Sequence, residues 1–361
     1  MEVNTDIVIV GAGISGHATA LALHRLGIKC LVLESAGIAF TTWTNAWRAL
    51  DALGIGDSLR QQHGQLYGVS SISSVTGDLT SYVSFTEKGK YGDHEARCVR
   101  RKALLEALAR DLPDGTIRYS SKVVSIEEAG FSKLVHLADG SILKTKVLVG
   151  NGARYGIIPC DNTAVYWFFT WSPSAQENST LQEADQLKLK QFLLSKLGKV
   201  PDQIRAVVED TKVEEFVRSP LEYRPPWQVL FGNISKDNVC VTGDACHPMT
   251  PDLGQGGCSA LEDGVILGRC LADVLLEKSS CQEKQNDENE YERIKRGLND
   301  YAKKRRWRAL DLISTGYMLG WAQEFDRFGM RILREKLLSA YLTRFFTKKA
   351  DIDPGQLVLE H

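Results

Sequence analysis

The start of the chain alternates short apolar runs with a helical pattern. Val8 to Val10 has no polar interruption, as a parallel strand covered on both faces requires. A helical pattern from Ala18 to Leu26 follows and ends at Gly27, and a second apolar run extends from Cys30 to Leu33. This order predicts a β-α-β unit, and therefore an α/β fold.

Beyond Glu34 the spacing of apolar residues predicts further helices and strands. Residues 64 to 86 alternate weakly and are expected to form sheet with turns. Helices are expected at Asn45 to Leu53, Glu95 to Leu112, Glu183 to Leu197, Asp202 to Asp210 and from Gly254 through Leu271. Strands are expected at Thr116 to Tyr119, Val123 to Glu127, Leu134 to Leu137, Ser141 to Val149, Gln228 to Gly232 and Asn238 to Thr242.

The last part of the chain is expected to be largely helical. Glu283 to Glu290 is polar and predicts a solvated linker, and a helix continues from Tyr291. Lys303 to Arg306 is interpreted as a solvated basic face of that helix. Leu312 to Phe346 carries many large apolar residues, which favours packing on the core; peripheral membrane contact or dimerisation is the alternative.

Glycines follow the first strand at the G-x-G-x-x-G spacing: Gly11, Gly13 and Gly16, with Ile14 and Ser15 between the last two. The first glycine allows a tight turn, the second lets the backbone approach a pyrophosphate, and the third lets helix and strand pack closely. The start of the following helix then faces the phosphates. Between two predicted strands, this spacing indicates a dinucleotide site.

Glu34 ends the second strand of this unit, 18 residues after Gly16. A carboxylate in that place can bind ribose hydroxyls and disfavours a 2′-phosphate. The nucleotide is therefore expected to be FAD or NAD rather than NADP.

A second signature follows the strand Asn238 to Thr242. A loop with two prolines leads into a long apolar helix, whose start offers free N–H groups and a positive dipole end. An aspartate at the end of the strand can accept hydrogen bonds from a polyol such as ribityl. The residues of this signature are Gly243, Asp244, His247, Pro248, Pro251, Gly254, Gln255, Gly256 and Gly257.

Composition limits the function classes. A length of 361 residues predicts about two domains, and 43% hydrophobic with 25% charged residues is ordinary for a soluble protein. The net charge of −1 favours neither nucleic acid nor an anionic membrane. The eight cysteines lack ligand spacing, so we expect buried thiols in a reducing compartment and no metal site. No run of about 18 apolar residues occurs, and the first strand leaves no room for a leader, so a cytoplasmic protein is expected.

The two signatures together resemble the group A FAD-dependent aromatic-ring hydroxylases, which share the para-hydroxybenzoate hydroxylase fold. Thr44 to Gly54, Ile157 to Cys160 and Val165 to Trp171 are similar to a plant subgroup of these monooxygenases. The resemblance covers nearly the whole chain. It implies an α/β fold: a Rossmann-like, glutathione-reductase-like FAD-binding domain, an interleaved and shortened β-sheet substrate domain, and a C-terminal helical segment.

The resemblance also implies where these units lie. The FAD-binding domain would comprise residues 1–63, 92–153 and 233–277, the substrate domain residues 64–91 and 154–232, and the C-terminal helical region residues 278–361. Arg101 is similar to the arginine that contacts ribose and pyrophosphate, and Val124 to a residue whose backbone contacts adenine. Carried over by motif, the FAD-binding residues are Gly11, Gly13, Ile14, Ser15, Gly16, Glu34, Arg101, Val124, Gly243, Asp244, Pro251, Gly254, Gln255 and Gly256.

The chain departs from the family pattern in two places. The family has an Asp-Gly pair after the strand that ends here at Gly150, and that pair is thought to serve both FAD and NAD(P)H. In this chain Gly150 is followed by Asn151 and Gly152, and several tens of residues of the usual substrate-domain sheet are missing. The loop after Glu34 is also short. Internal deletions are therefore expected.

The implied activity is hydroxylation of a small aromatic or conjugated substrate with NAD(P)H and O₂, through a C4a-hydroperoxyflavin. His247 is a candidate proton relay, and the alternative is a structural hydrogen bond. Pro251 and Tyr166 are weaker catalytic candidates; Tyr166 and Trp167 would line a substrate pocket or simply face the inside of a second sheet. The alternatives are an FAD-binding but catalytically impaired or regulatory protein, and another FAD-dependent oxidoreductase on the same scaffold.

Overall fold

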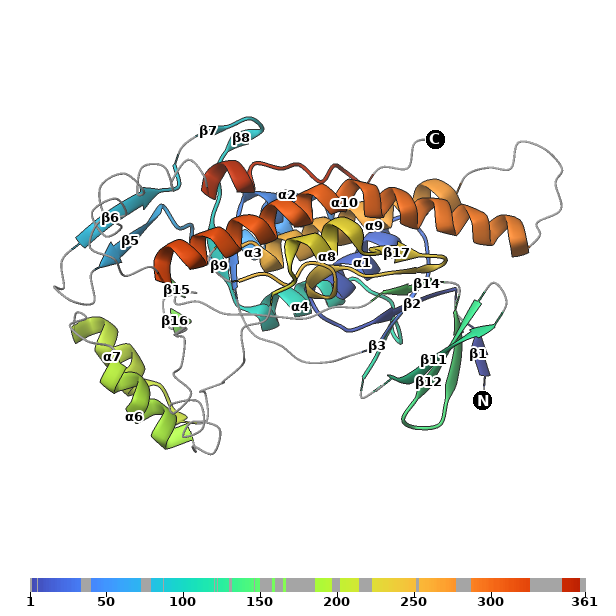
Figure 1. Ribbon diagram of the computed structural model, residues 1–361, viewed down its shortest axis with the longest axis horizontal. Helices are drawn as coiled ribbons and strands as arrows, with labels where there is room; N and C mark the ends of the chain where they lie inside the picture. The colour runs from blue at the N-terminus through green and yellow to red at the C-terminus, as the bar shows by residue number, and fades with distance from the viewer. Residues whose placement is uncertain are drawn as a thin grey trace.

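In the computed structural model of the chain (Figure 1), the two larger sheets lie beside a set of long helices. It describes residues 2–4, 6–33, 40–72, 79–86, 88–119, 121, 123–129, 132–145, 147–149, 158–159, 165–166, 186–196, 202–213, 223–250, 253–276, 287–324 and 346–357.

A six-stranded sheet forms the centre of the molecule. Its strand order is β10-β3-β2-β14-β18-β17, and all its pairs are parallel except β17 with β18. The predicted β-α-β unit is confirmed, with Ile9 opposite Val32 in the register of β2 and β3. The strands are β2 (Ile7–Val10), β3 (Leu31–Leu33), β10 (Ile117–Arg118), β14 (Val147–Val149), β17 (Ser235–Lys236) and β18 (Val239–Cys240).

A four-stranded sheet lies beside this central sheet (Figure 1), in the order β1-β13-β12-β11. Val135 and Leu137 of β12 pack against Val8 and Leu33 and join the two sheets. Its strands are β1 (Glu2–Asn4), β11 (Val123–Ala129), β12 (Ser132–Leu137) and β13 (Ile142–Thr145). Two-stranded pairs are β4 (Phe40–Thr42) with β9 (Arg97–Val99), β5 (Gly68–Ile72) with β6 (Leu79–Ser84), β7 (Lys88–Gly89) with β8 (Gly92–Asp93), and β15 (Ile158–Pro159) with β16 (Val165–Tyr166).

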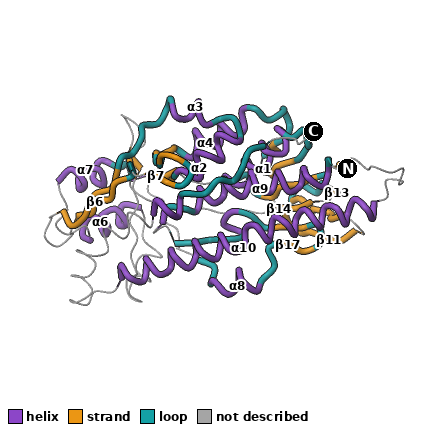
Figure 2. Tube along the Cα trace, turned by 90° about the horizontal axis from the view of Figure 1, so that it is seen from above, coloured by secondary structure: helices purple, strands orange, loops and turns teal. Residues whose placement is uncertain are grey.

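Helices cover the central sheet in layers. The long helix α9 packs against α1 and α2 on one side and α10 on the other, as Figures 1 and 2 show. The helices are α1 (Ile14–Arg25), α2 (Thr44–Ala52), α3 (Gly56–Arg60), α4 (Arg101–Arg110), α6 (Gln186–Lys196), α7 (Asp202–Asp210), α8 (Pro226–Phe231), α9 (Gly256–Leu275) and α10 (Asp287–Glu324), with a 3₁₀ turn η2 (Gly243–Ala245). None of the helices in these described ranges is long and apolar enough to cross a membrane.

The contact between α1 and α9 depends on small residues. Gly264 and Gly268 of α9 face Ala18 and Ala22 of α1, one helical turn apart on each helix. A Cβ on Gly264 would lie 2.5 Å from the Cβ of Ala18, and a Cβ on Gly268 would lie 2.6 Å from that of Ala22. Because neither glycine has a side chain, the two backbones approach closely, and the start of α1 is held near the start of α9.

Three of the predicted elements are wrong. The expected linker Glu283 to Glu290 overlaps helix α10, which already begins at Asp287. Arg97 to Val99 forms strand β9 because it pairs with β4, so helix α4 begins only at Arg101. The expected strand Gln228 to Gly232 is helix α8, which begins with Pro226 at a position where proline suits a helix start. Arg306 of α10 donates to the carbonyl oxygens of Leu230 (3.0 Å) and Gly232 (2.8 Å) and so closes the end of α8.

Helix α10 differs from the predicted pattern at one residue. Lys303 and Lys304 are exposed as predicted, but Arg305 is only 1% exposed and points into the protein. Leu312 and Ile313 are buried in the core. Residues 325–345 of the apolar segment lie outside the described residues, so membrane contact or dimerisation through this segment stays a prediction.

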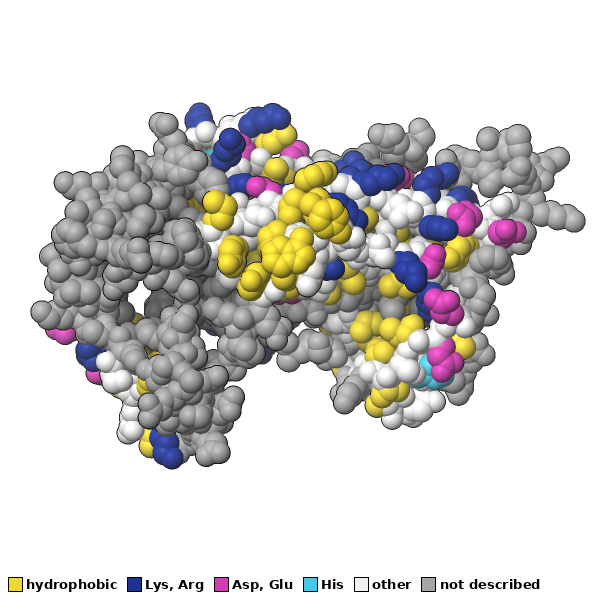
Figure 3. Space-filling view, in the orientation of Figure 1, with side chains coloured by type: hydrophobic (Ala, Val, Ile, Leu, Met, Phe, Trp, Pro, Cys, Tyr) yellow, Lys and Arg dark blue, Asp and Glu magenta, His cyan; other side chains and the backbone are white. Residues whose placement is uncertain are grey.

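Large apolar side chains are exposed around α8 and the middle of α10. On the face shown in Figure 3, apolar side chains gather over these helices. Trp227 and Phe231 of α8 and Trp307 of α10 are each more than half exposed.

Replacing Gly264 by alanine should destabilise the fold. The new Cβ would overlap the Ala18 Cβ and also lie 2.8 Å from backbone atoms of α1, so the two helices must separate. We expect the free energy of unfolding to fall by about 1 to 3 kcal/mol in denaturant titrations. Gly64→Ala is the control, because nothing lies within 4 Å of a Cβ there. Equal stability of both variants would contradict the close-packing explanation.

Candidate functional site

The first glycine signature forms the turn from β2 into α1. Gly11 has φ 106°, a conformation that favours glycine, and Gly13 is the residue that caps the start of α1. A Cβ on Gly16 would lie 2.1 Å from the carbonyl oxygen of Gly11 and 3.2 Å from the side chain of Ile9. The third glycine is therefore required for helix and strand to approach each other, as the spacing predicts.

The second signature lies at the same edge of the sheet. Strand β18 ends at Cys240, and β14 alone separates it from β2. Because these strands are parallel, their carboxyl ends meet at one edge, the usual place for a ligand in such sheets. The hydroxyl groups of Ser15 and Thr242 lie 2.6 Å apart and join the two signatures directly.

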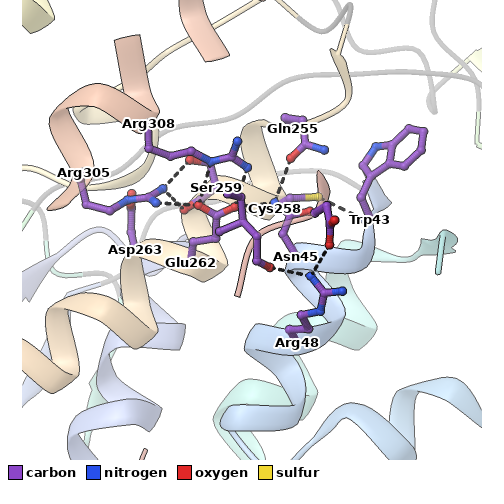
Figure 4. Close-up of polar contacts among 12 residues, drawn as sticks. Trp43, Asn45, Arg48, Gln255, Cys258, Ser259, Glu262, Asp263, Arg305 and Arg308 are labelled. Atoms are coloured by element: carbon purple, nitrogen blue, oxygen red, sulfur yellow. Dashed lines mark hydrogen bonds and ion pairs between the residues drawn. The ribbon is translucent and has the colours of Figure 1, made fainter. Parts of the chain in front are cut away.

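A buried carboxylate holds the second loop in place. Oδ2 of Asp263, on α9, accepts hydrogen bonds from the Thr242 hydroxyl (3.0 Å) and the Gly243 backbone N–H (2.7 Å), and lies 2.7 Å from Nε2 of His247. Its other oxygen, Oδ1, accepts from Nε of Arg305 on α10 at 2.5 Å (Figure 4). One side chain thus ties the loop that carries Asp244 to two helices.

The neighbouring carboxylate, Glu262, holds the start of α2 against α9. It accepts hydrogen bonds from Arg305 Nη1 (2.6 Å), Arg308 Nη2 (2.8 Å) and Asn45 Nδ2 (2.5 Å). The same amide group of Asn45 also donates to Oε1 of Gln255, at 2.9 Å. Gln255 caps α9, so the predicted FAD-binding residue Gln255 is fixed by a chain of contacts from α2 and α10 (Figure 4).

These acids are ionised in the folded protein. Burial alone would raise the pKa of Glu262, but Arg308 and Arg305 outweigh burial and lower it to about 2. Burial opposes ionisation of Asp263 too, yet Arg305 and then His247 hold the pKa of that carboxyl well below its usual range. Burial would lower the pKa of Arg305, but the carboxylates of Asp263 and Glu262 outweigh burial and raise this pKa above its usual range.

His247 is completely buried. Its Nε2 contacts Asp263, and its Nδ1 has no hydrogen-bond partner in the part of the chain that the structure describes. The backbone N–H of His247 donates to the carbonyl oxygen of Gly243. The hydrogen bonds of His247 hold the loop together, and its role as a proton relay stays a prediction.

Other predicted residues lie around this edge. Asp244 is half-buried in the turn η2, and Gly254 (φ 59°), Gln255 and Gly256 lead into α9.

Arg101 and Val124 have different surroundings. Arg101 is 5% exposed at the first position of α4; its charge lies close enough to lower the pKa of His17 in α1, although burial is the larger cause. Val124 is exposed, at a register shift where β11 begins. Glu34, Pro251 and the Gly150 to Arg154 junction lie outside the described residues, as does the side chain of Tyr166.

Cysteines line the inside of this site as free thiols. Cys246 follows Asp244 in the loop, and Cys258 lies in the first turn of α9. Burial raises the pKa of each of these thiols to about 12. They are therefore uncharged at neutral pH.

Comparison with known proteins decides the family. A family described as "FAD binding domain" matches residues 116–296, and one described as "Lycopene cyclase protein" matches residues 6–168. "Monooxygenase 2" of Arabidopsis thaliana is 46% identical over 412 aligned positions, which cover 99% of each chain. This chain belongs to the FAD-dependent monooxygenases.

Solved structures agree on the fold of this monooxygenase. Klebsiella pneumoniae HpxO complexed with FAD and uric acid superposes with a TM-score of 0.75 at 19% identity, covering 96% of each chain. A salicylate hydroxylase substrate complex superposes with a TM-score of 0.64 at 15% identity, covering 97% of this chain and 98% of the other. The alignment with the Arabidopsis relative runs over 412 positions, whereas this chain has 361 residues.

The chemistry of the site fits FAD, the cofactor of this family. Two helices, α1 and α9, begin at the shared edge, so their free N–H groups and positive ends can face a negatively charged or oxygen-rich ligand. Among the described residues, the nearest atom to a Cβ on Gly256 would be Oδ1 of Asp244, at 3.8 Å. The carboxylate of Asp244 can accept hydrogen bonds from ribityl hydroxyl groups. The free N–H groups at the two helix starts can donate to pyrophosphate oxygens.

The acid–arginine network of the monooxygenase was not among the features predicted from the sequence. A signal was available, because two adjacent acids in the middle of the apolar helix α9 require buried partners. Arg305 and Arg308 are one helical turn apart and could have been assigned to them. The residues missed are Asn45, Thr242, Glu262, Asp263, Arg305 and Arg308.

Asp263→Asn should weaken the whole site. The amide would leave Arg305 with less compensating charge in a buried environment, and the loop at Gly243 would lose an ionised acceptor. We expect a loss of about 3 to 5 kcal/mol in the free energy of unfolding. Asp273→Asn is the control, because Asp273 is exposed on the same helix. A loss of similar size in the control would contradict this assignment.

Acid should destabilise the protein through the same network. The pKa of Glu262 is about 2 in the folded protein against an ordinary 4.5, so its ionised form stabilises the fold above about pH 4.5. This contribution is lost as the pH falls towards 2. We expect the free energy of unfolding to decrease across this window, less steeply in Glu262→Gln than in the exposed-site control Glu288→Gln. A flat wild-type profile would contradict the assignment.

Proposed function

We propose that this monooxygenase uses NAD(P)H and O₂ to hydroxylate a small aromatic or conjugated molecule. The observation that carries the proposal is the joining of both signatures by Ser15, Thr242 and Asp263 at one sheet edge. Among the solved structures of the same fold, one is a complex with FAD and uric acid, and another is a salicylate hydroxylase substrate complex. Uric acid and salicylate are small conjugated rings. These names support the substrate class.

Different residues of this chain would bind different parts of FAD. Gly11 to Gly16 would hold the ADP half of FAD, and Arg101 would add a positive charge near the start of α1. Asp244 would bind the ribityl and pyrophosphate region, and Gly254 to Gly256 the edge of the ring. Glu34, Val124 and Pro251 would complete the site as the family resemblance implies.

The remaining chemistry belongs to the cofactor. When bound, FAD would supply a group that accepts two electrons from the nicotinamide and then activates O₂. One oxygen atom would enter the substrate, and the other would leave as water. The protein supplies fixed positions and a dry surrounding for that reaction. Asp263 and Arg305 contribute by fixing the loop that carries Asp244, without contact with the substrate.

A second candidate is an FAD-binding protein with impaired turnover. The observation that favours it is the length difference from the Arabidopsis relative. The chain lacks the Asp-Gly pair expected after β14, which in the family is thought to serve both FAD and NAD(P)H. Binding of FAD does not depend on that pair alone, so the two candidates differ in turnover rather than in cofactor content.

A direct assay separates the two candidates. We expect purified protein to be yellow, and to consume NADH or NADPH together with O₂ when small aromatic acids such as salicylate or urate are added. Asp244→Asn should bind FAD about 10-fold more weakly, because a charged hydrogen-bond acceptor is replaced by a neutral one. Asp273→Asn should bind it like the wild type.

Each outcome of this assay has a defined meaning. Bound FAD with no nicotinamide oxidation in the presence of any aromatic additive would overturn the hydroxylase proposal and support the impaired form. Protein that stays colourless after addition of FAD would overturn both candidates.

A further inference from the structure

Helices α8 and α10 together expose a group of large apolar side chains. Trp227 and Phe231, one helical turn apart on α8, are 61% and 83% exposed. Trp307 and Met318 of α10 are 67% and 68% exposed, and they lie about three turns apart on the same side of that helix. Figure 3 shows apolar side chains gathered over these two helices. We call these four residues the α8–α10 face.

Two contacts hold α8 against α10 as an antiparallel pair. At the end of α8, Arg306 donates to the carbonyl oxygens of Leu230 and Gly232. Just before α8 begins, the ring of Tyr223 stacks on that of Tyr317, with centroids 5.3 Å apart and an interplanar angle of 29°. Because α8 is tied to α10 at both ends, its exposed aromatic side chains stand on a fixed support.

Lysines adjoin the aromatic residues of this face. Lys303 and Lys304 lie one helical turn before Trp307 on α10, and both are exposed. Nζ of Lys303 lies 2.9 Å from a carboxylate oxygen of Asp300, yet 77% of the Lys303 side chain remains exposed. A surface ion pair of this kind is weak, so it leaves the lysine able to contact another anion.

Few acids offset the positive charge around the face. Positions 223–236, which include α8, contain Arg224 and Lys236 and neither Asp nor Glu. Positions 303–318 of α10 contain one acid, Asp311, which is paired with Lys349. The net charge of the whole chain is −1, so this excess of positive charge is local to the face.

Exposed aromatic residues beside lysines favour a lipid surface as the partner. Tryptophan rings prefer the boundary between the headgroups and the acyl chains, and lysines next to them attract anionic headgroups. A second copy of the chain fits this face less well. In a two-fold dimer each copy contributes the same patch, so the two positive rims would repel each other.

We propose that the α8–α10 face docks this protein on the surface of an anionic membrane. The rings of Trp227, Phe231 and Trp307 enter the headgroup region, and Lys303 and Lys304 contact lipid phosphates. The inference goes beyond the proposed hydroxylation and depends on neither turnover nor FAD.

Flotation with lipid vesicles tests the aromatic part of the face. We expect the wild type to bind vesicles of phosphatidylcholine with about 30% phosphatidylserine. The double variant Trp227→Ala/Phe231→Ala should bind them about 10-fold more weakly, because it loses apolar area that enters the interface. Tyr119→Ala is the control, because Tyr119 is 63% exposed outside the face, and it should bind like the wild type.

The charged part of the face has its own variant. Lys303→Gln/Lys304→Gln should bind the same vesicles about 5- to 30-fold more weakly, since each lysine near an anionic surface adds to the attraction. The matched control is Lys88→Gln/Lys102→Gln, which removes two lysines whose side chains are 84% and 87% exposed elsewhere. Binding by the wild type should also weaken at about 1 M salt, which screens these charges.

Several results would overturn the proposal. These are a wild type that does not float with anionic vesicles, one that floats equally with pure phosphatidylcholine, and a folded aromatic variant that binds like the wild type. A wild-type dimer that the aromatic variant converts to a monomer, without vesicle binding, would assign the face to a second copy instead. If the double variant does not fold, brominated lipids should quench the tryptophan emission of the wild type, and unchanged emission would contradict membrane docking.

Discussion

The arrangement of the site depends on the buried ion pair between Asp263 and Arg305. Both side chains are almost completely removed from water, and each lowers the cost of burying the charge of the other. Because the carboxylate has two oxygens, one serves the arginine while the other serves the loop from Thr242 to His247. The pair holds helix α10 and the loop from Thr242 to His247 against the same residue of α9.

The small residues between α1 and α9 add a second constraint of a different kind. The ion pair fixes the loop against α9, and Gly264 and Gly268 fix α9 against α1. Between these two contacts, the hydroxyl groups of Ser15 and Thr242 lie 2.6 Å apart. One hydrogen bond thus joins the two glycine-containing signatures, which lie more than two hundred residues apart in the chain.

Much of this fold could be predicted from sequence, since local patterns determine it. The β-α-β unit, the glycine turn and the start of α9 follow from periodicity and from the conformations that glycine allows. The errors have non-local causes. Arg97 to Val99 is a strand because β4 lies beside it, and Arg305 is buried because α9 presents two acids to it. The helical period predicts which side chains share a face of a helix, but it does not predict which other helix packs against that face.

The buried thiols around the loop have a consequence for the lifetime of the protein. Oxidants attack the thiolate form of cysteine, and a pKa of about 12 leaves almost no thiolate on Cys246 or Cys258 at neutral pH. Because these two sulfur atoms are uncharged and covered, both thiols are poor targets for oxidants.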